Sequence, residues 1–214
     1  MFTELLNNLI YPMIYTAIGA GIGGWVAYRI AKEQYSRDRL NETIGFVFLL
    51  KKTADRIAKS SKDMSKYIEG FEEKSNADSI RFVCVVMEKH LELNTDLLQL
   101  TQQWETCKER VSLCSSKFVC KNSNIRESIE QLEDNLPNIL FKIQSYKRLY
   151  ESFKKKYDEK SEKVGFEIND FLNTDESKRQ LRDASACLSK ISVLCKEISE
   201  IYGKLEKGKK FDLR

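Results

Sequence analysis

Residues 9–28, LIYPMIYTAIGAGIGGWVAY, contain no charged side chain, and they determine how we interpret the rest of the chain. The apolar character begins at Leu5, and about 20 such residues rising 1.5 Å each would cross a hydrocarbon core of about 30 Å. Tyrosine and tryptophan stand near both ends, where amphipathic rings favour the lipid headgroup level. The stretch predicts one membrane-spanning helix, and we assign residues 1–31 to a transmembrane anchor.

The charges that flank this stretch predict its orientation. Four basic residues follow it closely, whereas only Glu4 and the amino terminus precede it; the four are Arg29, Lys32, Arg37 and Arg39. Because basic residues favour the cytoplasmic side, the sequence predicts a single-pass protein of the inner (cytoplasmic) membrane with its C-terminal domain in the cytoplasm. A cleaved signal peptide would carry its basic residues before the apolar run, so it is disfavoured. A buried core helix is the remaining alternative for this stretch.

Small residues recur within the stretch at intervals of four. Gly19, Gly23 and Ala27 form one row, and Ala20 with Gly24 forms a second row on an adjacent face. Small residues at this spacing allow the backbones of two helices to approach closely in lipid. The rows predict a homo-oligomer that assembles through the span, although glycine and alanine are also simply frequent in such helices.

The composition beyond the anchor is typical of long amphipathic helices. The 214 residues include only two prolines, 42% are hydrophobic and 32% are charged. A net charge of +4 is too small to indicate a dedicated nucleic-acid binder, so a nucleic-acid partner is not expected. The six cysteines form no C-x-x-C pair, and we expect them to be reduced and to serve as small apolar residues.

Apolar residues at intervals of three and four predict four long helices. The stripes extend from Leu40 to Phe71, Ile80 to Phe118, Ile125 to Tyr157 and Leu181 to Leu205. The second stripe consists of Ile80, Val83, Met87, Leu91, Asn94, Leu98, Thr101, Trp104, Cys107, Val111, Cys114 and Phe118.

The predicted fold is all-α. An N-terminal transmembrane helix continues into an elongated antiparallel bundle over residues 32–206, and a basic flexible tail covers residues 207–214. Three local features accompany this prediction. The third helix continues through Pro137 with a kink, a short helix lies between Asp158 and Thr174, and Thr174 or Asp175 caps the last helix. Whether the first helix is continuous through Gly45 stays open.

The search for catalytic groups rests on one histidine. His90 would have to act as a general base or a metal ligand, but a carboxylate-bridged metal site needs Glu three residues before it, where Met87 stands, and a second histidine. Zinc sites need spaced Cys and His pairs that are also missing. We therefore expect a polar layer of the core formed by His90, Asn94 and Thr101, and no metal, cofactor or enzymatic activity.

A second group of polar residues lies in the third helix. Basic side chains alternate there with aromatic ones, as they do on some nucleic-acid and anionic-lipid surfaces. The basic residues are Lys142, Lys147, Arg148, Lys154, Lys155 and Lys156. Because the aromatic residues belong to the core stripe and acidic residues are interspersed, we favour a solvated helix face.

The row of Gly19, Gly23 and Ala27 in one N-terminal span, followed by an all-helical domain, resembles in outline the membrane accessory protein of type VI CRISPR systems. The resemblance implies an oligomeric pore that strengthens antiviral defence. The HEPN ribonucleases, a family of small helical bundles, are therefore also considered. Their signature is Arg followed four to six residues later by His. Here Arg81 is too far from His90 and Val83 to Val85 are apolar, so only a catalytically silent HEPN-like bundle is compatible.

The sequence thus leads to two expectations about function. The first is a non-enzymatic, membrane-anchored bundle that self-associates through its glycine-rich span and presents a cytoplasmic interaction domain to a protein partner of unknown identity. The alternative is an oligomeric pore-forming or membrane-depolarising effector of antiviral defence.

Overall fold

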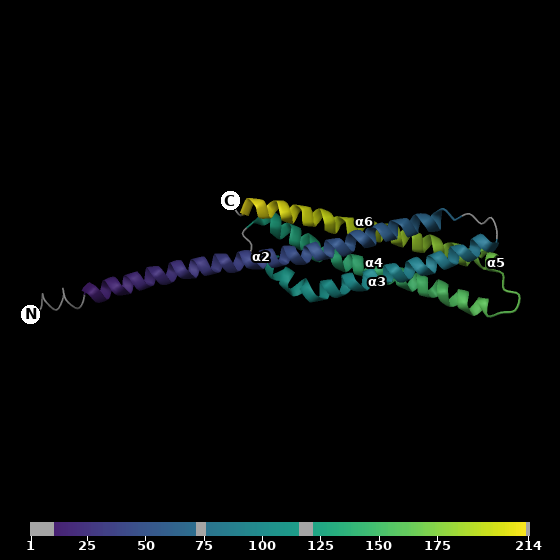
Figure 1. Cartoon of the computed structure of the whole chain (residues 1–214), viewed down its shortest axis with the longest axis horizontal. Coiled ribbons are helices and arrows are strands. Elements are labelled where there is room, and N and C mark those ends of the chain that lie inside the picture. The colour runs from purple at the N-terminus through teal and green to yellow at the C-terminus, as the bar shows by residue number, and fades with distance from the viewer. Residues whose placement is uncertain (1–10, 72–75, 116–121, 213–214) are drawn as a thin grey trace, which may run out of the picture. The chain divides into compact units, whose positions relative to one another are not determined.

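The computed structural model describes residues 11–71, 76–115 and 122–212. These residues form five α-helices and no strand. Figure 1 shows their arrangement. The helices are α2 (Tyr11–Glu69), α3 (Asn76–Ser115), α4 (Ser123–Ser161), α5 (Ile168–Asn173) and α6 (Asp175–Asp212). The all-α fold class is therefore confirmed.

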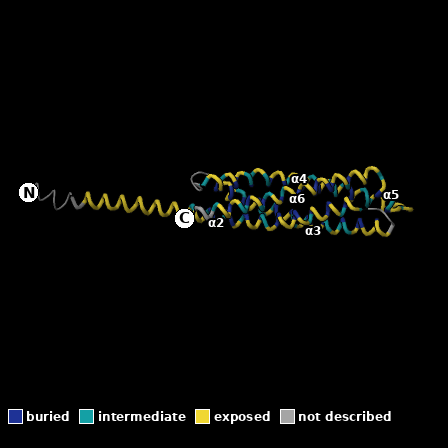
Figure 2. The backbone as a smooth tube through the Cα atoms, turned by 90° about the horizontal axis from the view of Figure 1, so that it is seen from above, coloured by how far each residue is buried: buried dark blue, intermediate teal, exposed yellow. Residues whose placement is uncertain are grey.

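The chain divides into two compact units, Met1–Glu42 and Thr43–Arg214. The second unit is a bundle in which the C-terminal part of α2 and the whole of α3, α4 and α6 lie side by side, as both views show (Figures 1 and 2). Contacts between the helices reveal antiparallel neighbours. Ser65 meets Ser185 while Ser192 bonds to Ala58, so α2 and α6 run in opposite directions.

The core of the bundle follows three of the four predicted stripes. Fully buried residues include Val47 and Ile57 of α2, Leu132 of α4, and Leu188 and Ile198 of α6. In Figure 2 the buried positions lie on the inward sides of these helices. The regular spacing of apolar residues on α2, α4 and α6 was therefore sufficient to identify the faces that pack.

The predicted stripe of α3 is only partly correct over its first half. Ile80, Leu91 and Leu98 are 51%, 66% and 54% exposed, whereas Phe82, Leu93, Leu97 and Leu100 are buried. The two sets occupy different faces of one helix. Before Trp104 the predicted stripe has one buried residue, Val83, and from Trp104 to Cys114 its members are buried. α3 has apolar residues on both faces, and the predicted spacing placed Ile80, Leu91 and Leu98 of the exposed face in the core stripe.

Interruptions that the sequence suggested do not break the helices. α2 is continuous through Gly45, which the sequence left open. α4 is continuous through Pro137, as predicted. The Asn138 side chain donates a hydrogen bond to the Asp134 carbonyl at 3.1 Å, close to where the proline lacks an N–H. The predicted short helix is α5, and α6 extends to Asp212, so residues 207–212 of the predicted tail are helical.

The predicted membrane span is not confirmed. Within residues 11–71, 76–115 and 122–212, no helix combines the length and the apolar character that crossing a membrane requires. Residues 5–10, with which the predicted span begins, lie outside the described residues. In the first unit, every side chain from Met13 to Ile30 is exposed.

Candidate functional site

His90 lies in the core of the bundle, 7% exposed. Its Nδ1 is 3.1 Å from the Tyr146 hydroxyl, which donates to Met64 Sδ at 3.5 Å, and its ring stacks on Tyr150. Burial and, to a lesser extent, the positive charge of Lys147 lower the pKa of His90 to about 4. The imidazole is therefore neutral at physiological pH and has aromatic neighbours where a general base would need a substrate.

The other two residues of the predicted polar layer do not join His90. Thr101 Oγ1 donates to the carbonyl of Leu97 in its own helix at 2.9 Å, and Asn94 is only partly buried. The residues that contact His90, Tyr146 and Tyr150, come from α4. Both belong to the predicted core stripe of that helix, but its spacing did not indicate that they would meet His90. The cluster has the properties of a packed polar spot in a core.

Cysteines of the described residues are free thiols, and four of the five are buried. Burial raises the pKa of Cys107 to about 11 and that of Cys195 to about 12, which makes both thiols poor nucleophiles. Cys84 is the exposed one. Across the described part of the chain, no three His, Cys, Asp or Glu residues gather in a way that could hold a metal ion.

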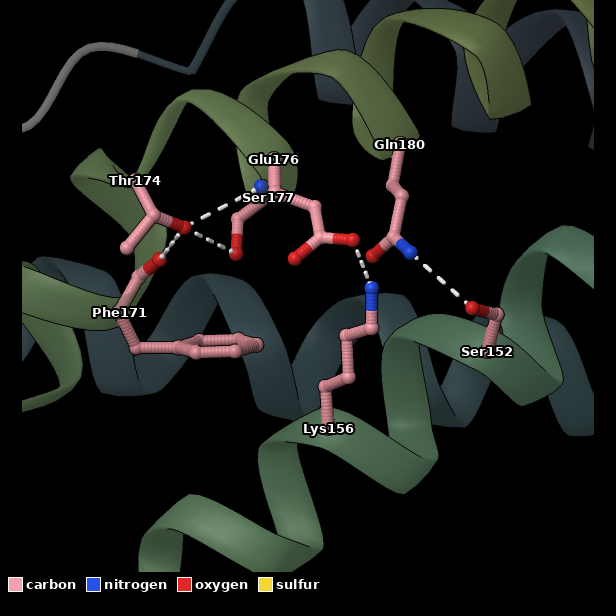
Figure 3. Close-up of polar contacts among 7 residues, drawn as sticks. All are labelled: Ser152, Lys156, Phe171, Thr174, Glu176, Ser177 and Gln180. Atoms are coloured by element: carbon pink, nitrogen blue, oxygen red, sulfur yellow. Dashed lines mark hydrogen bonds and ion pairs between the residues drawn. The ribbon is translucent and has the colours of Figure 1, made fainter.

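The junction of α4, α5 and α6 contains several polar contacts, which Figure 3 shows. Thr174 Oγ1 accepts a hydrogen bond from the Ser177 N–H at 3.2 Å, so Thr174 caps α6 as predicted. Lys156 of α4 forms an ion pair with Glu176 of α6, and the Gln180 amide donates to Ser152 Oγ at 3.0 Å. These contacts connect the start of α6 with α4, and they account for the polar residues of the junction as structural ones.

The six basic residues of the predicted basic surface lie along α4. Carboxylates pair with four of them: Glu151 with Lys147, Asp158 with Lys154, Glu159 with Lys155, and Glu176 with Lys156. Lys142 lies over the ring of Phe141. The acidic partners reduce the positive potential of this face, which agrees with a solvated helix face more than with a phosphate-binding surface.

The exposed apolar face of α3 is the strongest candidate for a functional site in the bundle. It consists of Ile80, Cys84, Leu91 and Leu98, which we call the α3 stripe. Their spacing of four, seven and seven residues keeps them on one side of the helix, over a length of about 27 Å. Four exposed apolar residues in line are the pattern that a second helix buries when it docks.

A groove lies between α2 and α3 and has a volume of about 250 Å³. Its lining residues are Phe46, Leu49, Gln99, Gln102, Gln103, Thr106 and Cys107. Among the described residues, the buried Oε1 of Gln103 has no hydrogen-bond partner. Because a buried unpaired oxygen is costly, a partner that supplied a donor here would gain from it.

The predicted packing residues of the span lie in the first unit. A Cβ atom added to Gly19, Gly23 or Gly24 would meet no atom within 4 Å apart from the adjacent backbone of its own helix, and Ala20 and Ala27 are exposed. The small-residue rows are thus open toward their surroundings within the first unit.

Comparison with known proteins gives no relative from which a role could be transferred. No family model, curated protein or solved structure matches the chain.

Proposed function

We propose that the chain is a non-enzymatic helical-bundle protein that is anchored to a membrane by its N-terminal segment and binds a protein partner through the α3 stripe. The observation that carries the proposal is the uncharged helical segment of residues 13–28, all of whose side chains are exposed. Ile14, Ile18 and Ile22 are 47% to 60% exposed. A helix that is apolar on all sides needs lipid or protein around it.

Lipid is the better match for this segment. Apolar residues surround the helix rather than forming one stripe, and aromatic residues stand at its end, at Trp25 and Tyr28. Leu5, Leu6, Leu9 and Ile10 would extend its apolar length beyond the described residues. The basic residues that follow support a cytoplasmic location of the bundle.

The second part of the proposal concerns the bundle. A helical partner with apolar residues at intervals of three and four could bury the α3 stripe in the way that amphipathic helices pair. The titratable groups are compatible with a binding role. His90, the only histidine, is buried and its pKa is lowered, and burial raises the pKa of the Cys107 and Cys195 thiols.

Membrane anchoring is tested by extraction of membranes with alkaline carbonate. We expect the chain to stay with the membrane pellet, and the variant Ile18→Asp/Ile22→Asp to move to the supernatant. The matched control places the same charges on exposed apolar residues of the bundle, as Phe141→Asp/Val193→Asp, and should remain in the pellet. Complete release of the unmodified chain would contradict the proposal.

Partner binding is tested with a photo-crosslinking amino acid in cells. Placed at Leu91, it should give a discrete protein adduct that Leu98→Glu abolishes, because a charge in the stripe opposes docking. The same amino acid at Val193, which is exposed on α6, serves as the control. Identical adduct patterns at both positions would remove the α3 stripe as a binding site.

An oligomeric pore is the alternative, and the open faces at Gly19 and Gly23 favour it. Close packing of several copies through these faces would agree with the resemblance to the accessory protein of type VI CRISPR systems and with a role in antiviral defence. Gly23→Leu should then abolish ion conductance and reduce the oligomer mass measured by light scattering in detergent. Ile22→Leu, one position away, should change neither. Unaltered conductance in Gly23→Leu would eliminate the pore.

A further inference from the structure

One face of the first unit changes its chemistry in a regular way along the helix. Ile14 and Ile18 are followed on the same side by Trp25, and then by Tyr28, Arg29, Lys32 and Tyr35. All of these residues are exposed. The face thus passes from aliphatic to aromatic to cationic side chains, which is the order of environments from a hydrocarbon core through its interface to the headgroups.

The rise of an α-helix relates this order to distances. If the Trp25 ring lies at the edge of the hydrocarbon, Arg29 and Lys32 lie about 6 Å and about 10 Å farther along the axis. The headgroup layer on one side of a bilayer is roughly 5 to 8 Å thick. The two cations would therefore lie within or directly above the layer that contains lipid phosphates.

Two arginines of this segment, Arg29 and Arg39, lie beside aromatic rings. The guanidinium carbon of Arg29 is 5.6 Å from the centroid of Trp25. Ten residues later, the guanidinium carbon of Arg39 is 5.2 Å from the centroid of Tyr35, and its Nε donates to the Tyr35 hydroxyl at 3.1 Å. A guanidinium over an aromatic ring can still donate to an anionic oxygen, which is the role we consider for Arg29.

Acidic residues reduce this charge without cancelling it. Glu33 lies 3.7 Å from Arg29, and Glu42 lies 3.5 Å from Arg39. Asp38 projects from the far side of the helix relative to Trp25. Between residues 29 and 39 there are four basic and two acidic side chains. The pair of Arg29 with Glu33 is exposed and of the kind that contributes little, whereas the pair of Arg39 with Glu42 is half-buried.

We propose that the helical face formed by Trp25, Tyr28, Arg29, Lys32 and Tyr35 binds the headgroups of anionic phospholipids. In this arrangement the rings of Trp25 and Tyr28 lie in the interface, and Arg29 and Lys32 contact phosphate oxygens. The inference rests on the proposed membrane anchoring and adds the lipid class to it. A nucleic acid would present phosphates too, but it would not bury the aliphatic residues that continue the same face.

The test measures energy transfer from Trp25 to dansyl-labelled lipids in vesicles that contain the full-length chain. Two probes are compared at trace amounts, one anionic and one zwitterionic, in vesicles of mixed composition. The signal of Trp25 is the difference between each chain and the same chain with Trp25→Phe, so the second tryptophan, Trp104, stays in place. One basic residue near an anionic surface is worth about 5-fold in partitioning, so we expect up to about 5-fold more transfer to the anionic probe.

Two variants separate a bound headgroup from general attraction. Arg29→Gln/Lys32→Gln should lower transfer to the anionic probe to that of the neutral one, as should 0.5 M salt. Arg37→Gln/Lys190→Gln removes the same charge from exposed sites outside the face and should keep the preference. Circular dichroism confirms that each variant is helical.

The outcomes distinguish this inference from the proposed function. No transfer from Trp25 to either probe would mean that the helix is outside the bilayer, which overturns the membrane anchoring and the inference together. Equal transfer to both probes in the unmodified chain would leave the anchoring intact and overturn the inference. If both double variants lost the anionic preference equally, the preference would come from net charge. That result would also overturn the inference that this particular face binds the headgroups.

Discussion

At the scale of single residues, His90 couples the stability of the bundle to pH. The folded chain holds its pKa near 4, below the usual value of 6.5, so the unfolded chain binds a proton more readily between these values. The contribution of His90 to stability is therefore complete above about pH 6.5 and is lost progressively as the pH falls toward 4.

We expect the free energy of unfolding to be about 1 kcal/mol lower at pH 5.5 than at pH 7.5, as measured by urea titration. Because the sequence has one histidine, His90→Gln isolates the effect. The variant should be less stable overall but should lose this pH dependence. The same slope in both proteins would assign the dependence to other groups.

Two glycines of α6 provide a matched pair of residue-scale substitutions. A Cβ atom at Gly203 would meet nothing within 4 Å, whereas one at Gly208 would lie 2.7 Å from Cγ1 of Ile125, which is fully buried. Gly203→Ala should raise the free energy of unfolding by about 0.5 to 1 kcal/mol through helix propensity. Gly208→Ala should lower it by about 1 kcal/mol through overpacking. Thermal unfolding followed by circular dichroism measures both changes. Equal increases in the free energy of unfolding would show that the Ile125 side chain moves to accommodate the added methyl group.

At the scale of the elements, small polar residues join α2 to α6. Ser185, Ser192 and Ser199 recur every seven residues on α6, and their hydroxyls bond across to α2: to Ser65 at 2.8 Å, to the Ala58 carbonyl at 2.8 Å and to Asp55. Bonds from short side chains to a neighbouring helix require the two helices to lie close together. A search for apolar spacing overlooks this contact because its residues are serines.

Ser185→Leu should lower the free energy of unfolding by at least about 2 kcal/mol. A leucine there would be too large for the contact and would remove the hydroxyl that bonds to Ser65 and, at 2.6 Å, to Glu69. Ser189→Leu, one turn along α6 at an exposed position, is the control and should change stability by no more than about 0.5 kcal/mol. Urea titration of both variants makes the comparison. A loss for Ser185→Leu as small as that for Ser189→Leu would mean that the contact between α2 and α6 tolerates larger side chains.

α3 explains why part of the candidate site could not be predicted. Leu97 and Leu98 are neighbours in sequence, yet Leu97 is buried and Leu98 is 54% exposed. Each of them fits an apolar stripe at helical spacing, on a different face of α3. Spacing alone therefore cannot decide which of the two faces is buried. The choice depends on which face the other helices of the bundle cover.

At the scale of the whole molecule, the two units differ in what they bury. The large buried side chains lie between Leu40 and Leu205, while residues 13–30 bury none. A chain shortened to begin at Leu40 should therefore remain helical, unfold cooperatively and behave as a monomer in light scattering without detergent. Loss of cooperative unfolding on shortening would show that the bundle needs the preceding residues.

The sequence alone determined the helical class of this protein, the approximate ends of its long helices and the apolar faces of α2, α4 and α6. Those features depend on local periodicity and capping residues, which act over a few turns of one helix. Only the tertiary structure decided which face of α3 is buried, that His90 contacts Tyr146 and Tyr150, and that serines line the contact of α2 with α6. These depend on residues far apart in the chain meeting in one core, because the free energy of a buried group depends on its neighbours.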